Sequence, residues 1–508
     1  MLNFHYNIKD KRMKNQFKIY VLMMAVSVSL LTACKKDFGD LNSNPNVPLS
    51  ANTKYLFSSA VIGTRGIPNG AAGLLYVQHM AEFIYTNESR YQQIQYSYDG
   101  IYAGPVQDLQ RIIKLNTDPA TKSLKEVLDN GSNENQIGFA RILKAFVMLQ
   151  ITDRWGNVPY REAGLGETNS QPKFDTQKFI YNDLLKELKE APLQLVTAQP
   201  NDPLFGGDIT KWKKWANSLR AIVALRMMKT EDVAVAKAAF SEAVTAGLMA
   251  SNADNAIFNY QSNATYESPW YTNYVRNGRT DYGVSQTVVD NNMKPNADPR
   301  LPVFSRTVGS PAVYKGIPYG VTDQYSAGVD GALLGRAIYA QNFPLQLTTY
   351  AQMCFTMSEA VLEGWVAGSD AEMISWYNKG IEASMDQWSA VSTNPIVSIT
   401  TAQKTAYEAM PNVLLTAGQT HDQKLEKIQT QKWLNFYMNN GYEAWAEWRR
   451  TGYPVLVPAR DAANADKKIP RRQAYPKTES DLNKVNYDAA VAAQGPDALS
   501  TRLWWDRS

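Results

Sequence analysis

Four consecutive amphipathic stripes between residues 135 and 250 constrain the fold of this 508-residue chain more than any other feature. Apolar side chains recur there every three or four residues, the spacing that places them on one face of an α-helix. Each such helix has to bury its stripe against a neighbour, so the region predicts a scaffold of paired helices. The stripes consist of Phe139, Ile142, Phe146 and Leu149; Ile180, Leu184, Leu188 and Ala191; Trp212, Trp215, Leu219, Ile222 and Arg226; and Val233, Phe240, Val244 and Leu248.

The rest of the chain places loops around this helical scaffold. Residues 257–350 are dense in Tyr, Asn, Gly and Pro with little periodicity, which predicts long irregular segments and a few short strands. Helices resume over 350–368 and 371–390, one long helix is predicted over 424–449, and residues 451–508 read as a Pro-rich, charged tail. We therefore expect a mainly α-helical fold of tetratricopeptide-like helix pairs with loop-rich insertions, although no strict repeat of about 34 residues is present.

The amino terminus has the layout of a secretory signal peptide. The first 18 residues carry a net charge of +4, and an apolar run follows over residues 19–33. A membrane-spanning helix needs about 20 apolar residues, and this run is shorter and interrupted by polar side chains. We expect residues 1–33 to be removed, residues 34–50 to form a tether rich in Asn and Pro, and residues 34–508 to form a single domain.

Cys34 stands where the apolar run ends. The preceding residues, Leu31-Thr32-Ala33, make the segment resemble the bacterial lipobox, in which the cysteine is acylated and becomes the first residue of the mature protein. Two or more acyl chains anchor a protein stably to a membrane. The sequence thus predicts lipidation at Cys34, and the alternative is an incidental cysteine beside an ordinary cleavage site. Cys354, the other cysteine, is expected to be a buried, inert thiol.

Charge and motifs exclude several functional classes. The signal segment and the whole chain both carry a net charge of +4, so the mature body is neutral and lacks the excess positive charge of a nucleic-acid binder. No nucleotide-binding glycine motif follows a predicted strand. His5, His79 and His421 are scattered without metal-ligand spacing, so no metal, cofactor or catalytic residue is predicted. A pair of carboxylates acting as a glycoside hydrolase stays open, because sequence alone cannot locate such a pair.

Two segments mix aromatic and polar side chains as ligand-binding loops do. Residues 82–102 and 266–282 interleave Tyr and Trp with Asn, Gln, Arg and Asp. Aromatic rings can pack on the C–H face of a sugar while amides and charged groups bond its hydroxyls, and the same mixture can bind a peptide. The alternative is that the rings are packing residues within loops. The candidate ligand contacts, chosen by local composition, are Tyr91, Trp270, Tyr271, Tyr274 and Arg276.

Several separated motifs together resemble the SusD/RagB family of outer-membrane lipoproteins of Bacteroidetes. They are the lipobox and the "KKDFGDLNSNPN" after it, "LQITDRWGNVPYREA", "NADPRLPVF" and "IQTQKWLNFYMNNGYEAWAEWRRTGYP". The resemblance implies a helical body whose loops form the ligand face, a lipid anchor on the outer membrane at the cell surface, and a SusC-like TonB-dependent transporter as partner. It implies an oligosaccharide or peptide ligand and no catalysis. Trp155, Trp448 and Arg449 lie in these motifs and are expected to be scaffold residues.

We therefore expect a surface lipoprotein that captures a nutrient, most simply an oligosaccharide, and delivers it to the transporter. Two other classes stay open. One is a surface glycoside hydrolase, which would release cleaved products. The other is a helical-repeat assembly factor in the periplasmic leaflet, which would be protected when intact cells are treated with protease.

Overall fold

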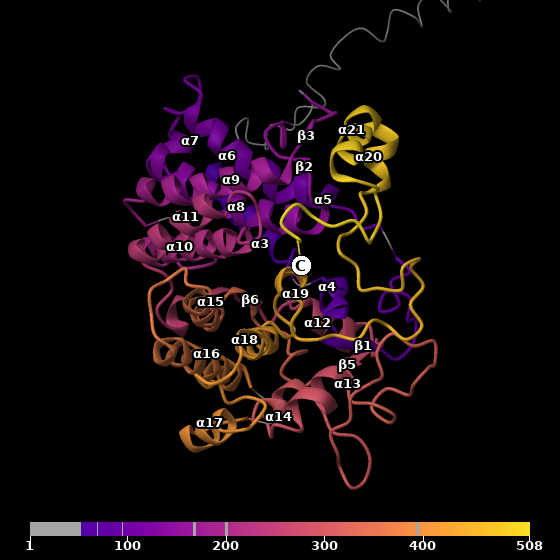
Figure 1. Ribbon diagram of the computed structural model, residues 1–508. Coiled ribbons are helices and arrows are strands. Elements are labelled where there is room, and N and C mark those ends of the chain that lie inside the picture. The colour runs from indigo at the N-terminus through magenta and orange to yellow at the C-terminus, as the bar shows by residue number, and fades with distance from the viewer. Residues whose placement is uncertain are drawn as a thin grey trace, which may run out of the picture. The chain divides into compact units, whose positions relative to one another are not determined.

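The four predicted helices between residues 135 and 250 are all present in the computed structural model. They are α8 (Asn133–Trp155), α9 (Gln177–Glu190), α10 (Ile209–Arg226) and α11 (Val233–Ala246). Figure 1 shows them stacked beside α6 (Gln107–Thr117), and α3 (Thr53–Thr64) packs on the same side. The structure describes residues 52–68, 70–93, 95–165, 169–198, 202–392 and 396–507, so Cys34, the signal segment 1–33 and the tether 34–50 lie outside it.

Local sequence explains where these helices begin and what they bury. Ser132, Thr176 and Asp208 each precede a helix, and their side-chain oxygens accept backbone N–H groups of its first turn. The first three predicted stripes face inward, with the Phe139 and Trp212 rings in edge-to-face contact at 5.1 Å between centroids, whereas Val233 of the fourth stripe is exposed. Buried aromatic rings thus join α8 directly to α10.

The loop-rich character of residues 257–350 is also confirmed. Short strands pair in an antiparallel manner: β1 (Met80–Glu82) pairs with β5 (Tyr282–Val284), and β4 (Ala256–Phe258) pairs with β6 (Leu345–Thr348). A third pair, β2 (Val158–Pro159) with β3 (Phe174–Asp175), closes the loop between α8 and α9. Short helical turns lie between, namely α12 (Pro269–Tyr271), α13 (Gln286–Val288) and α14 (Leu301–Phe304).

Helices resume after β6, as predicted, in α15 (Tyr350–Leu362) and α16 (Asp370–Val391). The next helices are α17 (Thr401–Glu408), α18 (His421–Asn435) and α19 (Gly441–Thr451). The single helix predicted over 424–449 is wrong, because the chain breaks between α18 and α19. Met438 adopts a positive φ of 54°, and the Asn440 side chain caps α19 by accepting the N–H of Glu443.

The break lets α19 turn and pack closely on α4 (Ala71–Tyr76). Glycines meet at the contact: a Cβ on Gly73 would lie 2.7 Å from the backbone nitrogen of Tyr442, and one on Gly441 would lie 2.5 Å from that of Leu74. Only glycine permits two helix backbones to approach this closely.

The segment 451–508, predicted as a tail, contains helices α20 (Lys477–Leu482) and α21 (Lys484–Gln494) and completes the core. The indole of the buried Trp505 donates to Asp153 Oδ1 at 3.0 Å, and that of Trp155 donates to the carbonyl of Ala474 at 3.0 Å. The tail interpretation was wrong because its charges are paired internally: Arg471 Nε donates to the buried Asp506 at 2.7 Å.

A buried network of charged residues ties the helices together. Arg226 on α10 contacts Asp153, Glu443 and Glu447, and Arg450 contacts Glu359 and Glu447. Such charges are tolerated inside a protein only when they are paired and hydrogen-bonded.

The residues expected to be scaffold take part in this core. Trp155 and Arg449 are fully buried, with the Arg449 guanidinium 3.6 Å from the centroid of the Trp445 ring, and Trp448 is half-buried.

Cys354 is buried, as predicted. His79 is enclosed by Trp433 and Tyr437, whereas His421 begins α18. No cluster of three or more His, Cys, Asp or Glu suited to a metal occurs in the described ranges, and no helix there is both long and apolar enough to cross a membrane.

Candidate functional site

The structure divides the predicted ligand contacts into buried and exposed members. Tyr91 is fully buried, and its hydroxyl accepts the backbone N–H of Ala459 at 3.0 Å. Its positive φ of 63° fits a residue whose side chain has to turn inward from a loop. With no exposed surface, Tyr91 cannot contact a ligand in this structure, and it braces the segment that follows α19.

Trp270 and Tyr274 are also mainly packing residues, with 5% and 8% of their surfaces exposed. The Tyr274 ring stacks on Tyr339 at 5.1 Å between centroids, and its hydroxyl donates to the carbonyl of Tyr282. Local composition suggested binding because Tyr and Trp suit both ligand faces and loop cores. The packing alternative holds for these two rings and for Tyr91.

Tyr271 and Arg276 keep exposed surface and lie together. The Arg276 side chain is 44% exposed and lies 5.8 Å from the centroid of the Tyr271 ring. It pairs with the buried Glu267, which also accepts hydrogen bonds from Thr272 at 2.8 Å and Gln341 at 2.9 Å. The hydrogen bond from Arg276 lowers the pKa of Glu267 to about 2, so the carboxylate stays ionised and fixes the arginine beside the ring.

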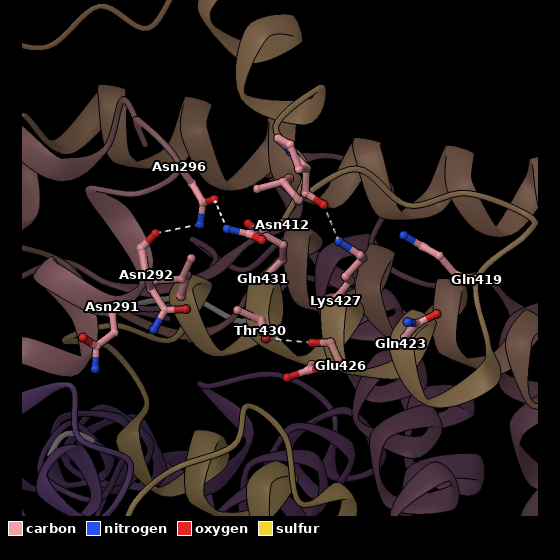
Figure 2. A pocket seen from close by; sticks show the side chains of 13 residues that line it. Asn291, Asn292, Asn296, Asn412, Gln419, Gln423, Glu426, Lys427, Thr430 and Gln431 are labelled. Atoms are coloured by element: carbon pink, nitrogen blue, oxygen red, sulfur yellow. Dashed lines mark hydrogen bonds between the residues drawn. The ribbon is translucent and has the colours of Figure 1, made fainter.

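A second site was not predicted. A pocket of about 420 Å³ opens between α18, the chain just before it and the helical turn Val289–Met293 with the residues that follow. Figure 2 shows amide side chains converging on it from these three segments. We call it the amide pocket, and it is lined by Asn291, Asn292, Asn296, Pro411, Asn412, Val413, Gln419, Gln423, Glu426, Lys427, Thr430, Gln431 and Leu434.

Hydrogen bonds to the fold orient the asparagines. Asn296 Nδ2 donates to the carbonyl of Asn292 at 2.7 Å, and Asn412 Nδ2 donates to Asn296 Oδ1 at 3.1 Å. Asn292 Nδ2 donates to the carbonyl of Thr287 at 2.7 Å. Asn292 and Asn412 therefore each use one side-chain N–H to bond the fold, and their side-chain oxygens remain available as acceptors for a ligand.

The floor of the pocket rests on a buried ion pair. Gln431 Nε2 donates to the Tyr407 hydroxyl at 2.8 Å, and Arg300 donates to Gln431 Oε1 at 3.1 Å. Arg300 is fully buried and pairs with the equally buried Asp298 at 2.7 Å. Burial opposes the charge of Arg300, but the attraction of Asp298 outweighs it and raises the pKa of the guanidinium. Gln431 is thus held by the Tyr407 hydroxyl and by Arg300, which stays charged at any physiological pH.

The charged groups of the lining balance. Lys427 Nζ donates to the carbonyl of Pro411 at 3.0 Å, and burial lowers the pKa of its ammonium. Glu426 supplies the one carboxylate, and its backbone carbonyl accepts the hydroxyl of Thr430 at 2.7 Å. Amides carry both donors and acceptors, as sugar hydroxyls do, and the volume lies in the range of small-molecule sites. The arrangement suits a neutral ligand rich in hydroxyl groups.

Part of this site left a signal in the sequence. Gln423, Lys427 and Gln431 recur every four residues and so form a polar stripe on one face of α18. The asparagines of residues 291–296 are also conspicuously dense. Their approach to Asn412 could not be predicted, because more than a hundred residues separate these segments.

Comparisons with known proteins concern the fold and the family. The model of the SusD-like family, described as starch-binding associating with outer membrane, matches residues 45–476. A solved chitin-binding protein is 26% identical, with a TM-score of 0.75 over 90% of this chain and 100% of the other. No curated protein matches the chain.

Two further structures share the fold. A SusD homologue from Bacteroides fragilis is 24% identical, with a TM-score of 0.76 over 90% of this chain and 100% of the other. A chitin-binding SusD homologue from Flavobacterium johnsoniae is 23% identical, with a TM-score of 0.70 over 90% of this chain and 99% of the other.

Proposed function

Because the chain belongs to the SusD-like family of outer-membrane-associated binding proteins, we propose that it captures an oligosaccharide and passes it to a SusC-like TonB-dependent transporter. It acts by binding and release, without bond chemistry. The amide pocket carries this proposal, because its lining offers hydrogen-bonding amides on three segments and a balanced charge. The likeness to a chitin-binding protein makes a chitin oligosaccharide the first ligand to test.

Tyr271 and Arg276 supply a second contact surface for the same ligand in our proposal. The partly exposed Tyr271 ring offers a face for stacking, and the arginine beside it offers fixed donors. We place the lipid anchor at Cys34, so that the body is held at the outer face of the outer membrane without a spanning helix.

Isothermal titration calorimetry of the mature protein with chitin oligosaccharides and maltooligosaccharides tests the binding. Asn412→Ala removes one amide from the pocket, and within the described part of the chain the Asn412 side chain bonds only Asn296. A lost hydrogen bond costs about 0.5–1.5 kcal/mol, so the affinity is expected to fall about two- to twelvefold. Asn263→Ala, an exposed asparagine outside the pocket, is the matched control and should leave the affinity unchanged.

Two outcomes would contradict the proposal. Equal affinities of the Asn412→Ala and Asn263→Ala variants would remove the amide pocket from the binding site. Release of shorter oligosaccharides during the titration would instead identify a hydrolase.

The location is tested separately in cells. Cys34→Ser should move the protein out of the membrane fraction if acylation anchors it, and protease added to intact cells should degrade the wild-type body. Retention of the Cys34→Ser protein in the membrane, or protection from protease, would contradict the surface anchor. Co-purification of the transporter with the wild-type protein tests the partner.

A further inference from the structure

Asparagine directly precedes glycine at four places in the chain, and this dipeptide can lose ammonia in water. The pairs are Asn69-Gly70, Asn130-Gly131, Asn277-Gly278 and Asn440-Gly441. The backbone nitrogen of the glycine attacks the side-chain amide of the asparagine, and glycine has no Cβ to obstruct the approach. The reaction needs an asparagine side chain in contact with water, a glycine N–H outside any hydrogen bond, and a peptide group that can rotate.

The fold protects the pair Asn130-Gly131. Asn130 is buried, so water has little access to its side-chain amide. The N–H of Gly131 donates to the carbonyl of Leu128 at 3.1 Å, which holds the nitrogen that would have to attack. The asparagine of the pair Asn69-Gly70 lies outside the described residues.

The pair Asn440-Gly441 is protected as well. Asn440 is buried, and its side chain accepts the N–H of Glu443 at 3.1 Å and donates to the carbonyl of Leu347 at 3.2 Å. Both ends of the amide group are therefore bonded within the fold. Gly441 packs against the backbone of α4, so it cannot rotate without separating α19 from that helix.

The pair Asn277-Gly278 has none of this protection. It lies in the loop between the helical turn Thr272–Arg276 and β5, and both of its residues are exposed. Within the part of the chain that the structure describes, neither the Asn277 side chain nor the Gly278 N–H forms a hydrogen bond. A Cβ on Gly278 would meet nothing within 4 Å, so open space surrounds the reacting atoms.

The backbone of this loop leaves the reacting peptide group free to turn. The N–H of Asn277 donates to the carbonyl of Thr272, and the N–H of Arg279 donates to that of Asn273, each at 3.0 Å. The peptide group that joins Asn277 to Gly278 lies between these two bonds. Gly278 has a φ of +62°, and glycine adopts φ of either sign, so rotation of this group costs little.

We propose that Asn277 deamidates spontaneously to aspartate and isoaspartate. The Gly278 nitrogen forms a bond to Cγ of Asn277 and loses its proton, the bond from Cγ to Nδ2 breaks, and ammonia leaves. Water then opens the cyclic imide. Cleavage at Cγ gives aspartate, and cleavage at the backbone carbonyl gives isoaspartate, whose chain runs through Cγ. Water is the co-reactant, and no atom changes its oxidation state.

The product carries a new carboxylate next to Arg276. That arginine is paired with Glu267 and lies beside the Tyr271 ring. A carboxylate one residue away competes with Glu267 for the guanidinium, and isoaspartate also lengthens the backbone of the loop. The consequence for binding rests on the proposed function, in which Tyr271 and Arg276 contact the oligosaccharide. Modified protein should bind that ligand more weakly.

Incubation of the mature protein in mildly alkaline water labelled with heavy oxygen tests the modification, followed by peptide mapping with mass spectrometry. The label enters when water opens the imide, so deamidation during later sample handling is not counted. Asn277 should convert about tenfold or more faster than Asn130 and Asn440, because those pairs have to open before they react. Asn277→Gln should remove the labelled product at this position, since glutamine would have to close a larger ring.

Conversion of Asn277 no faster than that of Asn130 or Asn440 would overturn the proposal, and so would a labelled product at position 277 in the Asn277→Gln variant. Calorimetry then compares fresh and incubated protein. Oligosaccharide affinity should fall on incubation of the wild-type protein and stay constant on incubation of Asn277→Gln, and equal falls in both would remove Asn277 as the cause. The modification is measured by mass alone, so absence of oligosaccharide binding would contradict the proposed function without affecting this test.

Discussion

Replacing Arg300 with Met tests whether the buried ion pair holds the amide pocket in shape. Arg300 is fully buried, and its guanidinium donates to Asp298 at 2.7 and 3.0 Å, to Ser384 at 3.0 Å and to Tyr407 at 3.2 Å. It also donates to Gln431, which lines the pocket. Methionine fills much of the same volume but offers no donor.

The cost follows from the charge left behind. Asp298 would remain buried with the backbone N–H of residue 300, at 2.9 Å, but without its cation. Removing one partner of a buried ion pair costs about 3–5 kcal/mol, whereas replacing both partners with apolar groups is often close to neutral. We therefore expect Arg300→Met to lower the free energy of unfolding by about 3–5 kcal/mol, and Arg300→Met with Asp298→Leu to recover most of that loss.

Urea unfolding followed by tryptophan fluorescence measures this difference. Oligosaccharide affinity, measured on the folded fraction, should fall in both variants, because Gln431 loses a partner in each. A loss of stability below about 1 kcal/mol for Arg300→Met, or a double variant no more stable than the single one, would refute the reasoning. An unchanged oligosaccharide affinity would separate the ion pair from the pocket.

Three further predictions concern packing and pH. Gly73→Ala should lower the free energy of unfolding by about 1–3 kcal/mol, because the added Cβ pushes α4 away from α19. Gly66→Ala is the control, since a Cβ there meets nothing within 4 Å, and it should change the free energy of unfolding in urea by less than about 0.5 kcal/mol. Trp270→Ala should lower the free energy of unfolding by about 3–5 kcal/mol, because the ring is buried. Tyr271→Ala should weaken oligosaccharide binding while changing the free energy of unfolding by less than about 1 kcal/mol. If Trp270→Ala weakened binding and Tyr271→Ala weakened stability instead, Trp270 would return to the ligand contacts. Burial raises the pKa of Glu82 to about 7, above its ordinary 4.5, so its contribution to stability is present at low pH and is lost as pH rises through 7. Urea unfolding at about pH 5 and pH 8 measures this difference in the free energy of unfolding, which is at most about 3 kcal/mol. Glu82→Gln should remove the contribution of Glu82 to the difference. The same difference in the variant and the wild-type protein would contradict the prediction.

The sequence predicted the helical scaffold well because the helices at residues 135–250 each carry a stripe that repeats within a few residues. It failed at α18 and α19, where apolar and aromatic residues continue at helical spacing through the break. The signal there was Asn440 before Gly441, since asparagine caps a following helix. Periodicity outweighed this local chemistry in the prediction.

The binding residues were harder to predict because composition does not report burial. Tyr91 and Tyr271 occur in similar aromatic and polar surroundings, yet the first is enclosed and the second is partly exposed. The amide pocket needs Asn296 and Asn412 to meet, and nothing in either segment specifies the other. Such sites depend on tertiary packing, which no local pattern encodes.

The burial of Trp505 against Asp153 also sets when this chain can finish folding. These partners are 352 residues apart, and Tyr475 bonds the carbonyl of Asn157 across a separation of 318. Closing loops of this length is slow, and α8 keeps an open apolar flank until the last segment has been synthesised.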